Sequence, residues 1–188
     1  MVALQYILTL ESIILGLAIG DLAKSLHTLL RARKRVRWDW LAPLTAIMIT
    51  VKIANHWWSW YRFGPVASRL TFEMLLGIMA TTILLYLVSA AALPDDAREQ
   101  EVDLRVHYER TAPRLWITFI AYGLLTSAIN LWMDVKIPSM IQVYWPLHLV
   151  TPVAATLLVV RNRWWHGAFL VGVIVIYIWQ FFGKTLGA

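Results

Sequence analysis

Six long apolar stretches run through this chain of 188 residues, and they constrain its fold more than any other feature. They cover roughly residues 3–23, 41–62, 70–92, 115–134, 144–161 and 164–183. A helix needs about 20 consecutive apolar residues to cross a bilayer, where each backbone N–H and C=O must be hydrogen-bonded within the helix. The sequence therefore predicts an all-α, polytopic integral membrane protein, with a single transmembrane domain over residues 1–188 built as a bundle of six helices.

The composition agrees with lipid as the solvent of this chain. Charged residues make up only 15% of the sequence, whereas an ordinary soluble domain carries about 25%. The absence of cysteine excludes disulfides, thiolate metal sites and cysteine nucleophiles. The formal net charge is +6. Because the basic residues cluster beside the apolar stretches, membrane topology explains them better than nucleic-acid binding, and we expect no nucleic-acid partner.

The basic residues also predict how the helices are oriented. Short cytoplasmic loops are enriched in Lys and Arg. The connections after the first, third and fifth stretches hold 12 of the 17 Lys and Arg residues, namely Lys24, Arg31, Arg33, Lys34, Arg35, Arg37, Arg98, Arg105, Arg110, Arg114, Arg161 and Arg163. We therefore expect these connections on the cytoplasmic side and both termini outside (N-out/C-out), in a bacterial cytoplasmic (inner) membrane.

The longest of these connections is a polar cytoplasmic loop expected over residues 93–114. Its sequence is compatible with two conformations. Residues 94–96 (Pro-Asp-Asp) are typical of a helix start, whereas apolar residues alternate as in a strand over residues 102–108. Both alternatives stay open on the sequence alone.

The second apolar stretch carries polar side chains that are unfavourable in lipid. An ionisable group at the centre of a membrane helix costs roughly 2.5–3.5 kcal/mol on insertion scales. At about 100° per residue, the polar side chains of this stretch fall on one continuous stripe, which consists of Thr45, Lys52, Asn55, His56, Ser59 and Arg62. This face of the helix therefore avoids lipid and meets either protein or water.

Two charged residues of opposite sign lie at similar depth in the first two helices. Counting from the expected outer boundary at 1.5 Å per residue, Glu11 lies ~12 Å and Lys52 ~15 Å below it. An unpaired carboxylate or ammonium at that depth is unfavourable. We therefore expect the side chains of Glu11 and Lys52 to form an ion pair, directly or through one water.

Further polar groups lie in the outer halves of the other helices, whereas the inner halves hold few. We expect an outward-facing polar pocket lined by Glu11, Lys52, Asn55, His56, Glu73 and His148. Ionisable residues that face a membrane cavity often mark ion or proton pathways. The sequence thus favours a channel or transporter for protons, ions or a small solute. The alternatives are a purely structural polar network and an accessory or structural subunit of a larger membrane complex.

A haem or metal site is a further alternative at three of these residues. His56, Glu73 and His148 could together ligate haem or a divalent metal if they face one another. Nothing in the sequence requires a cofactor, so none is expected, and haem or a divalent metal stays an alternative. An enzyme is the weakest class, because no nucleophile–base pair stands out.

Glycines predict close contacts between helices. Gly16 and Gly20 form a G-x-x-x-G pair, and Gly77 lies one turn from Glu73 and Thr81. Small residues at this spacing let two helix backbones approach closely. We expect these contacts within the fold, with packing between protomers as the alternative. The expected partners are therefore membrane lipids and a second copy of the chain or a larger membrane complex.

Overall fold

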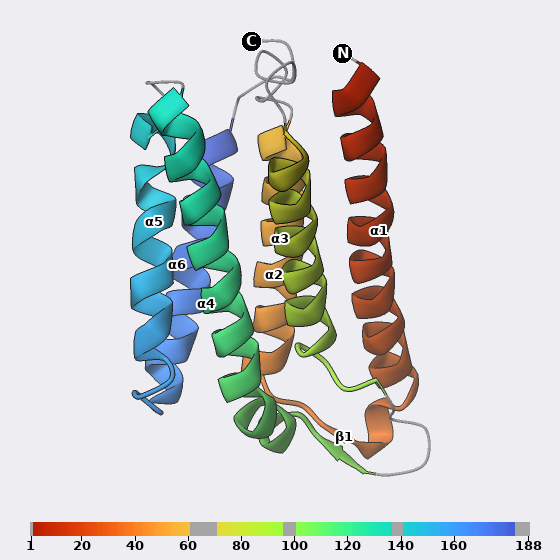
Figure 1. Ribbon diagram of the computed structural model, residues 1–188. Helices are drawn as coiled ribbons and strands as arrows, with labels where there is room; N and C mark the ends of the chain where they lie inside the picture. The colour runs from red at the N-terminus through yellow and green to blue at the C-terminus, as the bar shows by residue number, and fades with distance from the viewer. Residues whose placement is uncertain (1, 61–70, 96–100, 137–140, 183–188) are drawn as a thin grey trace.

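The computed structural model describes residues 2–60, 71–95, 101–136 and 141–182 (Figure 1). Over these residues the chain forms six α-helices, one 3₁₀ turn and two strands of two residues each. The helices are α1 (Val2–Arg31), α2 (Leu41–Trp60), α3 (Phe72–Ala90), α4 (Leu104–Lys136), α5 (Ile141–Thr156) and α6 (Arg163–Phe181). The 3₁₀ turn and strands are η1 (Arg33–Arg35), β1 (Val36–Arg37) and β2 (Val102–Asp103). The predicted all-α fold is confirmed.

Successive helices run in opposite directions, so that α1 begins and α6 ends at the same end of the bundle (Figure 1). Helices α1, α3, α4 and α5 stand side by side in a row, and α2 and α6 pack behind them (Figure 1). The α1–α2, α3–α4 and α5–α6 connections all lie at the opposite end. We call it the basic end because most Lys and Arg residues lie in these connections or in the helix turns that flank them.

Three helices are long and apolar enough to cross a bilayer, by length and composition. The qualifying segments within the described residues are Gln5–Arg31, Phe72–Ala90 and Leu104–Trp132. The apolar character of α2 is reduced by Lys52 and its polar neighbours, and α5 contains only 16 residues. The chain is therefore a helical protein with at least three helices suited to a membrane.

The start of α4 corrects the expected loop over residues 93–114. Residues 104–114 are helical and form the first three turns of α4, so the helical alternative holds there and the helix begins well before the expected residue 115. The helix begins early because the Asp103 carboxylate caps it: Oδ1 accepts hydrogen bonds from the backbone N–H groups of Arg105 (2.9 Å) and Val106 (3.2 Å). The alternative of a strand over 102–108 holds only for β2, which pairs in parallel with β1.

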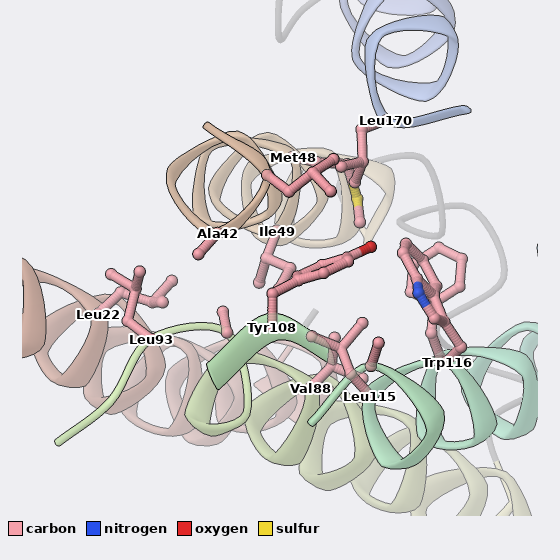
Figure 2. Close-up of a cluster of buried hydrophobic side chains, with 14 of the residues drawn as sticks. Leu22, Ala42, Met48, Ile49, Val88, Leu93, Tyr108, Leu115, Trp116 and Leu170 are labelled. Carbon is pink, nitrogen blue, oxygen red and sulfur yellow. The ribbon is translucent and has the colours of Figure 1, made fainter. Parts of the chain in front are cut away.

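A large apolar core fills the half of the bundle nearer the basic end. Figure 2 shows the Tyr108 ring of α4 lying against Ile49 and Met48 of α2, with Trp116 beside it. All four side chains are buried. The indole of Trp116 makes edge-to-face contacts with Phe119 and Phe169, at ring-centroid distances of 5.8 and 5.4 Å. This aromatic packing joins α4 to α6 and closes the centre of the bundle.

The glycines pack differently from one another. A Cβ atom added at Gly77 would lie 3.0 Å from Ile129 Cδ1, so this glycine faces α4 at close range. A Cβ atom at Gly16 or Gly20 would meet nothing within 4 Å. The expectation that these two glycines pack within the fold is therefore wrong, because the buried face of α1 is the one that carries Leu15. Packing between protomers stays a prediction.

Candidate functional site

The polar stripe of α2 faces protein rather than lipid. Lys52, Asn55 and His56 are each at most 5% exposed, and Thr45 is fully buried two to three turns away. Burial of three polar side chains in a membrane-type helix is unfavourable unless each finds a partner. The neighbouring helices α1, α3 and α4 supply hydrogen-bond partners for His56, and aromatic rings of α4 and α6 lie beside Lys52. Asn55 accepts from Lys52 on its own helix, and its Nδ2 atom has no hydrogen-bond partner among the described residues.

His56 is the centre of a hydrogen-bond network that joins four helices. Its Nε2 atom lies 3.2 Å from Oε2 of Glu11 on α1, and its Nδ1 atom lies 3.0 Å from the hydroxyl oxygen of Tyr122 on α4. The hydroxyl group of Thr82 on α3 donates to Oε1 of the same carboxylate. All four side chains are buried. We call Glu11, His56, Thr82 and Tyr122 the histidine network.

The distances in the histidine network fit a consistent set of donors and acceptors. A carboxylate only accepts hydrogen bonds, so the Nε2–H group of His56 donates to Glu11. In the neutral tautomer the Nδ1 atom then accepts the hydroxyl proton of Tyr122, whereas a doubly protonated ring donates to that hydroxyl oxygen instead. The imidazole therefore bridges Glu11 and Tyr122 in either protonation state.

Lys52 lies beside this network but does not pair with Glu11. Its ammonium nitrogen donates to Oδ1 of Asn55 at 3.4 Å and lies 5.0 Å and 4.6 Å from the ring centroids of Tyr122 and Tyr177. Among the described residues no carboxylate lies within ion-pair distance of this ammonium group, so the direct form of the predicted Glu11–Lys52 pair is wrong, and a contact through one water stays a prediction. The depths estimated from the sequence could not decide whether Lys52 or His56 is the partner of Glu11, because the two residues are four positions apart, which is only ~6 Å along a helix.

A small polar cavity adjoins the network between α2, α4, α5 and α6. Its volume is about 30 Å³, which is enough space for a water molecule. The ammonium group of Lys52 and the rings of Tyr122 and Tyr177 line it, and its other polar lining residues are Thr126, Ser127, Asn130 and Thr151. Because α4 contributes residues from Phe119 to Asn130, the lining extends over three turns toward the end of the bundle where α1 begins. We call this space the lysine cavity.

The structure brings only part of the predicted pocket together. Lys52 lines the lysine cavity, whereas Glu11, Asn55 and His56 are buried but are not among its lining residues. Glu73 lies in the first turn of α3 with its side chain exposed, away from the histidine network. His148 belongs to α5, but its side chain lies outside the described residues.

Sequence reasoning missed Thr82, Tyr122 and Tyr177. Tyrosines are common at the two membrane interfaces, so the presence of a tyrosine in a membrane helix does not by itself indicate a functional site. The available signal was depth, because Tyr122 lies seven residues inside the apolar stretch over 115–134. Thr82 carried no comparable signal, because a threonine can donate to its own helix, as Thr81 does to the carbonyl oxygen of Ile78.

Among the described residues, no group of three or more His, Asp or Glu side chains lies close enough to hold a metal ion. The described part of the predicted triad does not converge, since His56 is buried and Glu73 is exposed. A metal or haem site that involves His148 stays a prediction. Comparison of the chain with protein-family models, curated proteins and solved structures found no match.

Proposed function

We propose that this protein crosses a bacterial cytoplasmic membrane six times, with both termini outside. Two features support this topology. The basic connections lie together at one end of the bundle, as expected for cytoplasmic loops. In addition, every helix exposes large apolar side chains, for example Leu17, Ile47, Leu76, Leu124, Leu149 and Val175 on α1 to α6 in turn. Large apolar side chains exposed on all six helices are unfavourable in water and are expected to face lipid.

We further propose that the protein carries protons, as a channel or as a proton-coupled transporter. The observation that carries this proposal is that His56 contacts Glu11 at one ring nitrogen and Tyr122 at the other, while Tyr122 also lines the lysine cavity. A histidine can take up a proton at one nitrogen and release one from the other, and the tyrosine hydroxyl can pass it on. A water in the lysine cavity would extend this route beyond Tyr122.

The route is closed toward the basic end in this conformation. On α4, Phe119 is the lining residue of the lysine cavity nearest the basic end. One turn closer to that end lie Leu115 and Trp116, whose side chains are almost completely buried. We call Leu115, Trp116 and Phe119 the aromatic layer. Apolar constrictions of this type gate membrane pathways by excluding water. Proton transfer across the membrane therefore requires this aromatic layer to open.

Removal of a single oxygen atom tests the proton route. The purified protein would be reconstituted into liposomes with a pH-sensitive dye inside, and a potassium gradient with valinomycin would drive protons across. Tyr122→Phe keeps the buried ring but removes the hydroxyl group that contacts His56, so we expect at least a tenfold loss of proton flux. Tyr86→Phe, on α3 outside the histidine network, is the matched control and should behave as wild type.

Two results would contradict the proposal. One is a wild-type protein, folded by circular dichroism, that gives no dye response at either polarity of the gradient. The other is a Tyr122→Phe variant whose flux equals that of wild type.

A further inference from the structure

A second pocket lies at the basic end, between the first turns of α4 and the α5–α6 connection. Its volume is about 360 Å³, which falls within the range of small-ligand sites. Tyr108, Glu109, Arg161 and Arg163 are among its lining residues. None of its lining residues belongs to the histidine network or lines the lysine cavity. We call it the arginine pocket.

The charges in the arginine pocket favour an anion. Arg163 forms an ion pair with Asp39, and its Nη1 atom lies 3.5 Å from Oε1 of Glu109. That Nη1 atom is buried and has no hydrogen-bond partner among the described residues. Arg161 lines the pocket without an ion-pair partner in the described part of the chain, and Glu109 is also bound by Arg105 at 2.9 Å. Two arginines thus line the pocket beside the carboxylate of Glu109, whereas Asp39, the other carboxylate that Arg163 binds, is not among the lining residues.

Helix α6 adds to this positive potential. It begins at Arg163, beside the pocket, and the positive end of a helix dipole favours an anion there. Pro113, another lining residue, has no N–H group to bond the carbonyl oxygen of Glu109 one turn earlier.

The surroundings of the pocket indicate that the anion is carried by a lipid. The residues before Arg161 in the α5–α6 connection are Leu157, Leu158, Val159 and Val160, and the side chain of Val159 is 82% exposed. Such a surface is unfavourable in water and suits the edge of the hydrocarbon layer. A guanidinium group that follows it directly lies at the level of the lipid phosphates.

We propose that the arginine pocket binds the phosphate group of an anionic phospholipid in the leaflet at the basic end. Arg161 and Arg163 bind the phosphate oxygens, and the acyl chains lie along the exposed surface of Leu158 and Val159. Planar guanidinium groups match the geometry of phosphate oxygens. This site depends on the chain lying in a membrane and is independent of proton transfer through His56.

Thermal unfolding of the full chain in neutral detergent tests this site. A ligand that binds only the folded state raises Tm in a saturable way. Three additives would be titrated: dioleoylphosphatidylglycerol, dioleoylphosphatidylcholine and inorganic phosphate. We expect only phosphatidylglycerol to raise Tm, and Arg161→Gln to weaken its apparent Kd about fivefold, the effect of one basic residue near an anionic lipid.

Matched variants separate the site from net charge. Arg110→Gln removes the same charge from an exposed position of α4 outside the pocket and should leave the phosphatidylglycerol response unchanged. Arg161→Lys retains the charge but not the planar guanidinium group, so its affinity should lie between those of wild type and Arg161→Gln. Equal responses to the two lipids, or equal losses in Arg161→Gln and Arg110→Gln, would overturn the site. A rise in Tm with inorganic phosphate that disappears in Arg161→Gln would contradict a lipid as the ligand and would indicate a site for a free anion.

Discussion

Removal of the Glu11 carboxylate should destabilise the bundle chiefly through His56. The substitution Glu11→Ala removes the carboxylate oxygen that lies 3.2 Å from the buried Nε2 atom of His56, and the Thr82 hydroxyl oxygen, at 3.4 Å from the same nitrogen, is a more distant acceptor. Thr82 is affected less, because its hydroxyl group also lies 3.1 Å from the carbonyl oxygen of Ile78 and can donate there instead. The same carboxylate is therefore expected to couple strongly to one partner and weakly to the other.

The burial and contacts of Glu11 indicate where its coupling energies fall within the ranges known for hydrogen bonds. Hydrogen bonds to charged groups contribute about 1.5–3 kcal/mol in soluble proteins, whereas side-chain hydrogen bonds between membrane helices average about 0.6 and reach about 1.7 kcal/mol. Glu11 is 1% exposed, so we place its coupling to His56 at about 1–1.7 kcal/mol, in the upper part of the membrane range. The coupling to Thr82 should be about 0.5 kcal/mol, and that to Lys52 within the ~0.5 kcal/mol expected of residues without direct contact.

Three double-mutant cycles measure these couplings. Each combines Glu11→Ala with one of His56→Ala, Thr82→Ala or Lys52→Met, and unfolding free energies come from reversible denaturation in mixed micelles followed by helical circular dichroism. A cycle cancels the separate effect of each substitution and keeps the pairwise energy. If the Glu11–Lys52 coupling exceeds the Glu11–His56 coupling, then Lys52 is the partner of the carboxylate and our reasoning about the histidine network is refuted.

Two further predictions address topology and helix packing. Reporter fusions should all give a cytoplasmic signal when placed after residues 36, 103 and 162, and one external signal among them would contradict the proposed orientation. Gly167→Ala should lower the unfolding free energy by about 1–3 kcal/mol, because the new Cβ atom would lie 2.3 Å from the Trp40 ring. Gly172→Ala, with nothing within 4 Å, should leave stability unchanged or raise it by up to ~1 kcal/mol; equal effects in a denaturation assay would contradict the packing described for α6.

The helical class and the buried face of α2 follow from the sequence alone. Long apolar stretches must satisfy their backbone hydrogen bonds internally, which makes helices the expected structure. The polar stripe containing Lys52 and His56 follows from the angular spacing of residues on a helix, so the burial of this face of α2 could be predicted. Both are local properties, because they depend only on the order of residues within one element.

The partners of the buried polar groups were decided by the tertiary structure. Depth along a helix placed Glu11 near both Lys52 and His56, and only the rotation of α1 against α2 selects His56. The same rotation turns Gly16 outward, although its spacing is that of a packing motif. The rotations of α4 and α3 likewise bring Tyr122 and Thr82 into contact with the histidine network. The rotation of each helix about its axis depends on side chains from several other helices at once, and no single stretch of sequence contains that information.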